Sequence, residues 1–235
     1  MREPSAEERI DYPSLLTAAI AAQPDAPVAY LSEELPYLWR DAYLLMTLRP
    51  TNIHRVRLGT FEYLYDDLDS LEALGAAPTS ATAESRLVGV LGRSAPQPRK
   101  RSSEDGRLRG FIGRTNTEFG SGWDKGHYIG HELGGRVAGM EANVFIQRRA
   151  LNRGWSSEGK IYRSMERFCR THPGTFCFSR PFYADETSKP SFVEFGVLRA
   201  PGDLWVQLFD NRGRTARDET PNPSLRRTLP GRSTG

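Results

Sequence analysis

The apolar and polar positions of the first ninety residues follow mainly helical patterns. Residues 12–23 and 61–75 place their apolar side chains at helix spacing, and residues 35–50 are apolar enough to be buried as a helix or a strand. Only residues 85–92, "SRLVGVLG", are typical of a short strand. We therefore expect residues 1–92 to form a mainly helical N-terminal domain.

The second part of the chain has a different pattern, with short apolar runs between turn residues. An amphipathic helix is predicted within 156–174, because serine precedes it and Pro-Gly follows it. Strands are predicted at 107–114, 124–130, 175–183, 191–199 and 203–211. The fold class expected for the whole chain is α+β, with antiparallel strands in the domain of residues 107–211.

Two segments have a composition unsuited to a folded core. Residues 93–106, "RSAPQPRKRSSEDG", are rich in proline, serine and charge, which predicts a linker between the two domains. Residues 212–235 are basic and almost without apolar side chains, which predicts a disordered tail.

The net charge of +3 conceals two oppositely charged parts. Residues 1–90 carry a net charge of −7 and residues 91–235 a net charge of +10. A basic domain favours a polyanionic partner such as nucleic acid. The acidic part could shield the basic one, or bind an inhibitor, an immunity protein or an activating partner.

The start of the chain and its apolar runs bear on localisation. No run approaches the eighteen or so apolar residues that a membrane span needs, and the first residues have acids and a proline where a signal peptide has an apolar segment. We expect a protein that is cytoplasmic as synthesised, with no membrane partner; export by a specialised system stays open.

The chain has two cysteines, Cys169 and Cys177, too few for a disulfide framework. They could form one bridge, but two reduced thiols are favoured. Together with His172 they could also suggest a structural zinc site, although a fourth ligand is missing.

Residues 123–135, "WDKGHYIGHELGG", concentrate the residues suited to proton transfer. In a strand, Lys125 and His127 share one face, where a histidine could deprotonate water and a lysine supply positive charge. This pair suits hydrolysis at a phosphate. Because Mg²⁺ needs only one or two oxygen ligands from the protein, Asn152 in "ALNRGW" could hold the ion.

These segments resemble the DNA/RNA non-specific endonuclease family of the ββα-metal (His-Me finger) superfamily. The similarity lies in "DKGHYIGHELGG", "ANVFIQRRALNRG" and "IYRSMERF". It covers roughly residues 107–210 and no part of the N-terminal domain. The residues that match the family pattern are Asp124, Gly126 and His127, then Asn143 and Gln147, then Leu151, Asn152 and Gly154, and finally Glu166. The implied fold is a ββα-metal finger.

The resemblance also implies a role for each matching residue. His127 would be the general base, Asn152 the direct ligand of a single Mg²⁺ or Mn²⁺ ion, and Glu166 a ligand through a water molecule. An arginine that steadies the phosphate is expected, and Arg114 is preferred over Arg109. The family's products carry 5′-phosphate ends.

The sequence departs from the family pattern at three points. Lys125 stands where many members have arginine. Lysine keeps the positive charge but lacks the planar guanidinium that can bind two phosphate oxygens at once. Ile146 replaces a proline. The insertion "WSSEGK" moves Glu166 farther from Asn152 than in the family, so that Glu158 is an alternative to Glu166.

The function that we expect is that of a metal-dependent, sequence-nonspecific endonuclease acting on DNA, with RNA as a further candidate substrate. Its biological role would be that of an effector or toxin in bacterial conflict or antiviral defence. Asp124, Asn143, Gln147 and His131 would support the site. Two alternatives stay open: a non-catalytic basic module that binds nucleic acid, and a zinc hydrolase that uses His127 and His131.

Overall fold

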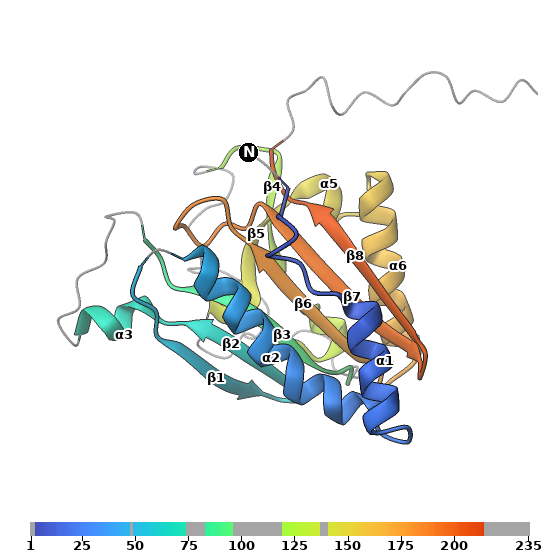
Figure 1. Ribbon diagram of the computed structural model, residues 1–235. Coiled ribbons are helices and arrows are strands. Elements are labelled where there is room, and N and C mark those ends of the chain that lie inside the picture. The colour runs from blue at the N-terminus through green and yellow to red at the C-terminus, as the bar shows by residue number, and fades with distance from the viewer. Residues whose placement is uncertain (1–2, 48, 74–82, 96–118, 137–140, 214–235) are drawn as a thin grey trace, which may run out of the picture.

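The computed structural model describes residues 3–47, 49–73, 83–95, 119–136 and 141–213, which form three layers (Figure 1). A six-stranded sheet lies in the middle, two long N-terminal helices cover one face, and a hairpin with two further helices covers the other. This mixture of helices and antiparallel sheets confirms the α+β class. The expected strand 107–114, with Arg109 and Arg114, lies outside the described residues, as do the linker beyond residue 95 and the tail beyond residue 213.

The central sheet is antiparallel throughout, in the strand order β1-β2-β3-β6-β7-β8. The strand predictions for 85–92, 175–183, 191–199 and 203–211 are confirmed within one or two residues. The bounds are β1 Ile53–Leu58, β2 Phe61–Asp66, β3 Arg86–Arg93, β6 Phe176–Phe182, β7 Phe192–Ala200 and β8 Asp203–Asp210.

The division into two domains at residues 93–106 is wrong, because one sheet crosses it. Strand β3 pairs with β6 from Val90↔Ser179 to Arg93↔Phe176, so strands from both parts of the chain share backbone hydrogen bonds. The N-terminal part, whose regular structure is more helix than strand as expected, also supplies three of the six strands of this sheet. Composition marks 93–106 as a connection, but a connection between paired strands has the same composition as one between domains.

The predicted helix over 61–75 is wrong in its first half, which is strand β2, while α3 (Leu68–Ala73) is helical. Phe61 and Leu64 fit helix spacing, but Phe61 and Tyr63 also alternate as a strand requires. Strand β2 has partners on both sides, β1 and β3, and its register with β3 shifts between Leu64 and Tyr65. Pairing in the sheet therefore overrides the local helical pattern.

Helices α1 (Tyr12–Ala22) and α2 (Pro27–Met46) cover one face of the sheet, so that the helix expected over 12–23 is confirmed. Helix α1 begins after Asp11, whose carboxylate accepts a hydrogen bond from the Ser14 amide at 3.1 Å. Trp39 of α2 is fully buried over Gly89 of β3, where a Cβ would overlap the indole ring. The glycine in "LVGVL" therefore makes room for the helix layer.

The hairpin of β4 (Trp123–His127) and β5 (Val144–Arg148) lies on the opposite face of the sheet and leads into two helices. Short helix α5 (Arg149–Asn152) follows β5 directly, and α6 (Ser157–Thr171) begins after Ser156, whose hydroxyl accepts from the Gly159 amide at 3.0 Å. Buried residues of α6 pack against β7, which confirms the helix predicted within 156–174. Short 3₁₀ turns η1 (His131–Leu133) and η2 (Glu141–Asn143) lie in the connection between β4 and β5.

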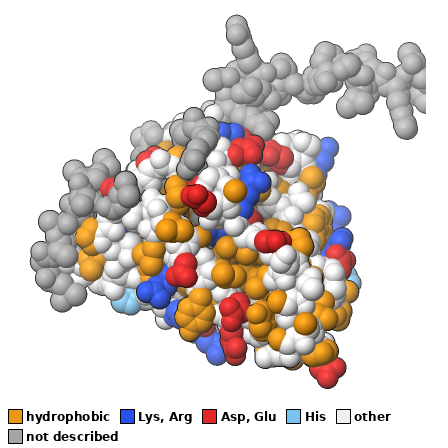
Figure 2. Space-filling view, in the orientation of Figure 1, with side chains coloured by type: hydrophobic (Ala, Val, Ile, Leu, Met, Phe, Trp, Pro, Cys, Tyr) orange, Lys and Arg blue, Asp and Glu red, His pale blue; other side chains and the backbone are white. Residues whose placement is uncertain are grey.

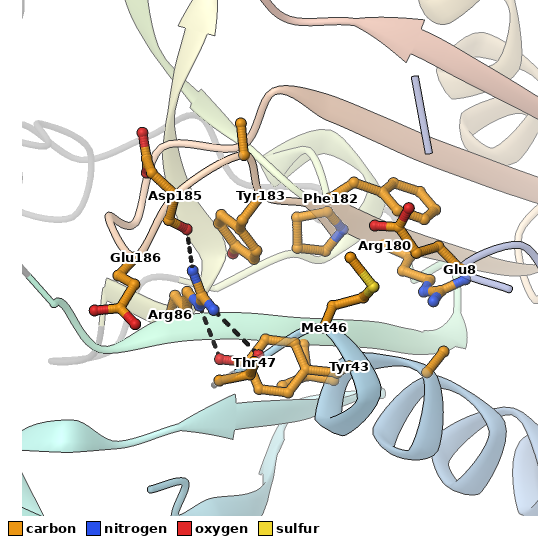
Figure 3. A pocket seen from close by; sticks show the side chains of 14 residues that line it. Glu8, Tyr43, Met46, Thr47, Arg86, Arg180, Phe182, Tyr183, Asp185 and Glu186 are labelled. Atoms are coloured by element: carbon orange, nitrogen blue, oxygen red, sulfur yellow. Dashed lines mark hydrogen bonds between the residues drawn. The ribbon is translucent and has the colours of Figure 1, made fainter. Parts of the chain in front are cut away.

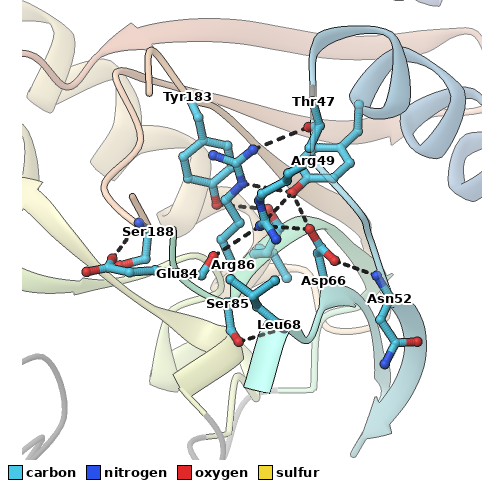
Figure 4. Close-up of polar contacts among 12 residues, drawn as sticks. Thr47, Arg49, Asn52, Asp66, Leu68, Glu84, Ser85, Arg86, Tyr183 and Ser188 are labelled. Carbon is cyan, nitrogen blue, oxygen red and sulfur yellow. Dashed lines mark hydrogen bonds and ion pairs between the residues drawn. The ribbon is translucent and has the colours of Figure 1, made fainter. Parts of the chain in front are cut away.

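A buried polar network closes the end of the sheet near α2 (Figure 4). Asp66 and Arg49 form an ion pair of 2.9 Å in which both side chains are fully buried. Asp66 also accepts hydrogen bonds from the Tyr43 hydroxyl at 2.6 Å and the Asn52 amide at 2.8 Å. The network joins α2, the segment after it and β2.

The outer face of α2 bears large hydrophobic side chains, among them Tyr37 and Leu45. Figure 2 shows hydrophobic side chains mixed with charged ones on this side of the molecule. None of the helices in the described ranges combines the length and the apolar character needed to span a bilayer.

Candidate active site

Strand β4 carries all four residues of "DKGH", residues 124–127, which the sequence singles out. Its register with β5 sets Asp124 opposite Gln147 and His127 opposite Val144. Because successive side chains of a strand point to opposite faces, Lys125 and His127 share one face. Both are half-buried, which leaves them partly accessible to solvent.

Asp124 connects β4 with helix α5 and with Arg153, the residue after it, through four hydrogen bonds. Its carboxylate accepts from Arg149 Nε at 2.9 Å, from Arg153 Nε and Nη2 at 2.7 and 3.0 Å, and from Asn152 Nδ2 at 3.2 Å. Burial alone would raise the pKa of Asp124, but the hydrogen bonds from Arg153, Arg149 and Asn152 outweigh it and lower the pKa below its ordinary value. Asp124 therefore stays ionised and holds α5 against the strand.

Asn152 is half-buried at the end of α5, where its orientation is set by Asp124. The amide nitrogen is the end that contacts Asp124, so that the carbonyl oxygen is the end able to bind a cation. An amide oxygen is a hard ligand of the kind that Mg²⁺ prefers. The side chain thus fits the role expected of it.

Glu166 lies on α6 beside the loop that follows His127. A Cβ on Gly130 would come within 2.9 Å of Glu166 Oε1, while Oε2 accepts from Arg163 Nη1 at 3.0 Å. The side chain is only 16% exposed. Burial raises the pKa of Glu166, the Arg163 guanidinium opposes this rise, and Glu132 adds to it. A cation nearby would offset the cost of burying this carboxylate.

Glu158, the alternative to Glu166, is engaged elsewhere. Its carboxylate pairs with the guanidinium of Arg148 in β5, and the Arg148 side chain is only 5% exposed. Glu158 therefore compensates a buried positive charge. Between the two glutamates, Glu166 is the one beside the segment that carries His127.

The side chains of Asn143 and Gln147 contact the backbone of the segment that carries His127. The fully buried Asn143 side chain binds both backbone groups of Ile129, accepting from its N–H at 2.9 Å and donating to its carbonyl at 3.0 Å. The buried Gln147 amide packs over Gly126, where a Cβ would overlap it. These contacts explain why "DKGH" has a glycine before the histidine and why an asparagine precedes β5.

The two histidines of the segment lie on different elements. His127 ends β4, and its backbone carbonyl accepts from the Tyr162 hydroxyl of α6 at 3.4 Å. The next residue, Tyr128, is buried and stacks on Phe145 with ring centroids 4.3 Å apart. His131 starts η1, which ends at Gly134 with a φ of 97°. The backbone around His127 is thus held from two sides.

Cys169 and Cys177 are free, buried thiols, as the sequence favoured. Contact with the Cys169 thiol, with burial as the second cause, raises the pKa of Cys177 well above its ordinary value. His172 is exposed and stacks on Phe168 with centroids 4.2 Å apart. Within the described parts of the chain there is no group of three or more His, Cys, Asp and Glu side chains suited to a metal ion.

The residues that attach the hairpin to its surroundings are not predicted by any pattern in the sequence. Asn211, just after β8, accepts from the Arg148 amide at 2.7 Å and donates to the carbonyls of Ile146 and Pro190, each at 2.8 Å. The same holds for Tyr162, whose hydroxyl donates to the His127 carbonyl. No local pattern distinguishes these residues, because their partners lie far away along the chain; only Arg149 and Arg153, on either side of Asn152, were visible as basic residues.

Four of the predicted site residues contact the segment 124–130, and Glu158 contacts a different residue. Hydrogen bonds and close packing link Asp124 with Asn152, Asn143 with Ile129, Gln147 with Gly126, and Glu166 with Gly130, whereas Glu158 pairs with Arg148. No protein-family model matches this chain, and no curated protein matches it either.

Proposed function

We propose that the chain is a metal-dependent, sequence-nonspecific endonuclease that hydrolyses phosphodiester bonds of DNA and, as a further candidate substrate, RNA, and that residues 123–171 carry a ββα-metal finger. The observation that carries the proposal is the hydrogen bond between Asp124 and Asn152. It joins the "DKGH" strand to the asparagine that the family resemblance assigns to the metal. The order hairpin β4–β5, then α5 and α6, is what a strand-strand-helix finger requires.

The donor set suits Mg²⁺ or Mn²⁺ better than zinc. Asn152 offers a carbonyl oxygen, and Glu166 a carboxylate whose burial a cation would compensate. One ion per site would stabilise the charge on the scissile phosphate and on the leaving oxygen. The zinc alternative would need His127 and His131 to converge from β4 and η1.

In the proposed hydrolysis each side chain has a separate role. His127 accepts the proton of the attacking water, the new bond forms between water oxygen and phosphorus, and the bond from phosphorus to the 3′ oxygen breaks. The leaving oxygen takes a proton from solvent, which gives 3′-hydroxyl and 5′-phosphate ends. Lys125, on the same face of β4 as His127, adds positive charge. Arg114 keeps its proposed role at the phosphate, outside the described residues.

The exposed face of α6 supports a polyanionic substrate. Four basic residues at spacings of three and four occupy one side of this helix, beside Glu166: Lys160, Arg163, Arg167 and Arg170. Arg163 and Arg170 also contact Glu166 and Glu132. A basic stripe on a helix contacts phosphates without reading bases, which agrees with loose sequence specificity.

Plasmid DNA, single-stranded DNA and RNA incubated with the purified protein and Mg²⁺ test the proposal. We expect cleavage that EDTA abolishes and that His127→Ala reduces by about 10²- to 10⁴-fold, the usual contribution of a general base. His172→Ala is the matched control, since His172 is exposed at the end of α6 and stacks on Phe168. Its activity should equal that of the wild type.

The same assay separates the two alternatives. A non-catalytic binder would shift DNA in a gel without cutting it, and the absence of cleavage of all three substrates would refute the enzyme. A zinc hydrolase would lose activity with His131→Ala, would copurify with Zn²⁺, and would tolerate Asn152→Ala. We expect the opposite: Asn152→Ala inactive and His131→Ala largely active.

A role as an effector or toxin in bacterial conflict or defence follows from the proposed activity, since an unrestrained nuclease would damage its own cell. Residues 1–92 remain our candidate for binding an inhibitor or an activating partner. Because β1 to β3 belong to the central sheet, this partner would bind the surface of the N-terminal helices, not a detachable domain.

A further inference from the structure

A cavity of about 250 Å³ lies between α2 and the end of β6, on the sheet face opposite the β4–β5 hairpin. Figure 3 shows Arg180, Glu8 and Phe182 at one end and Arg86 and Glu186 at the other, with Met46 and Tyr183 between them. The Arg180 guanidinium lies 4.6 Å from the ring centroid of Phe182. The cavity is too small for nucleic acid and has the size of a small organic molecule.

Arg180 is a buried arginine with one hydrogen-bond donor that the described residues leave unused. It is only 4% exposed, its Nη1 lies 4.0 Å from Glu194 Oε2, and this nitrogen donates no hydrogen bond within the described structure. The Tyr12 hydroxyl donates to the same Glu194 oxygen. Glu8 lines this end too, and its carboxylate accepts from the Ser5 amide. A buried guanidinium with an unused donor is well suited to a carboxylate or a phosphate.

Arg86 lines the other end of the cavity and is held by its own contacts. Its three nitrogens donate to the Tyr43 hydroxyl at 2.8 Å, to the Asp185 carbonyl at 2.7 Å and to the Thr47 hydroxyl at 3.3 Å. Its guanidinium lies 4.4 Å from the ring centroid of Tyr183. These contacts hold the aromatic side of the cavity in place.

Glu186 offers an acceptor at the same end. Its Oε2 is buried and has no hydrogen-bond partner within the described residues. The neighbouring Asp185 carboxylate is turned to Thr187, accepting from its amide at 3.0 Å and its hydroxyl at 2.6 Å. An N–H or O–H group would satisfy the Glu186 oxygen.

We propose that this cavity binds a small organic anion that places an acidic group at Arg180, a flat apolar body against Phe182 and Tyr183, and a hydrogen-bond donor at Glu186. Carboxylates and phosphate esters share the required acidic chemistry. The binding site is independent of the proposed nuclease activity.

Isothermal titration calorimetry with matched probes tests the proposal on the full chain. The reference probe is 3-(4-hydroxyphenyl)propionate, and 4-hydroxybenzylphosphonate represents the phosphate class. We expect saturable binding of at least one of them. The neutral analogue 4-(3-hydroxypropyl)phenol should bind at least about tenfold more weakly, and 3-phenylpropionate, which lacks the donor, about fivefold more weakly than the reference, the usual effect of one hydrogen bond.

Three variants connect binding to the cavity. Glu186→Ala should remove the difference between the hydroxylated and the unsubstituted propionate, and Arg180→Gln the preference for the anion over the alcohol. Met46→Trp should block binding by filling the cavity, while Leu45→Trp, at a neighbouring position that is 72% exposed, should bind normally. Thermal unfolding checks that each variant is folded.

Absence of saturable binding of both anions up to about 10 mM would overturn the proposal. Equal affinity for the neutral alcohol, or unchanged binding by Met46→Trp, would overturn it as well. If Arg180→Gln does not fold, Met46→Trp and Glu186→Ala decide alone. Because the readout is binding, a protein that cleaves no nucleic acid can still satisfy the test.

Discussion

At the scale of single residues, buried polar groups determine the geometry of both the sheet and the candidate site. Asp66 and Arg49 share a fully buried ion pair, and Asn143 binds both backbone groups of Ile129. Such groups are costly unless each finds its partner, so they specify one arrangement of the elements that carry them.

Asp66→Ala tests this cost directly. Removal of the carboxylate leaves the Arg49 guanidinium buried without its partner, and we expect the free energy of unfolding to fall by about 3–5 kcal/mol. Urea unfolding followed by circular dichroism measures the change. Asp69→Ala, at an exposed position of α3, is the control and should change stability little. Equal effects of the two substitutions would contradict the role given to Asp66.

Asp210 predicts a pH dependence of stability. Burial would raise the pKa of Asp210, but hydrogen bonds from Arg212, at 2.8 to 3.0 Å, outweigh it and hold the pKa below the ordinary value of 3.8. A carboxyl whose pKa is lower in the folded than in the unfolded state stabilises the fold above the unfolded pKa, and this contribution is lost as pH falls through the folded pKa.

Asp210→Asn should therefore lower the free energy of unfolding near pH 7, and the difference from the wild type should shrink as pH falls below 3.8. Urea unfolding at about pH 7, 5 and 3 measures this difference. Asp203→Asn, in an exposed pair with Arg199, is the control for a general charge effect. A difference that is the same at all three pH values would contradict the assignment.

At the scale of elements, helix α6 has two functions on its two sides. Its buried side, with Tyr162, Met165 and Cys169, packs into the core, and its exposed side carries the basic stripe of Lys160, Arg163, Arg167 and Arg170. Glu166 lies between the two sides, against Gly130. The helix therefore links the proposed metal site to the proposed phosphate-binding surface.

DNA binding by α6 can be measured in the His127→Ala background, where cleavage does not interfere. Lys160→Ala and Arg167→Ala should each weaken binding and reduce the slope of log K against log salt by about 0.9 for each phosphate that the side chain neutralises. Fluorescence anisotropy with a labelled duplex at several salt concentrations gives the slope. Arg199→Ala, on the sheet at the end of β7, should leave the slope unchanged, and an unchanged slope for both α6 variants would exclude this surface.

At the scale of the whole molecule, one sheet unites the acidic and basic parts of the chain. Strands β1 to β3 come from the acidic part, and β3 pairs with β6 from the basic part. The two faces of the middle of this sheet are covered, one by α1 and α2 and the other by the hairpin and α6. The candidate nuclease site and the anion cavity therefore lie on opposite sides of the same sheet.

A fragment of residues 93–235 should not fold. Removal of β1 to β3 would leave the edge of β6 without its partner strand and would expose Phe176 and Phe178, which pack under the N-terminal helices. We expect no cooperative thermal transition in calorimetry, in contrast to the full chain. A soluble fragment with a sharp transition would show that the two parts are independent after all.

The sequence by itself determined the local features: the helix within 156–174, most of the strands, and the residue types in "DKGH" and "ALNRG" that suit phosphate hydrolysis. Each depends on neighbours a few positions away, through periodicity, capping and turn residues. Only the tertiary structure decided that Phe61–Asp66 is a strand and that β3 pairs with β6. It also decided that Glu158 forms an ion pair with Arg148 and that Asn211 is hydrogen-bonded to the hairpin. These depend on hydrogen bonds and charge pairs between residues far apart in the chain, whose partners no local pattern identifies.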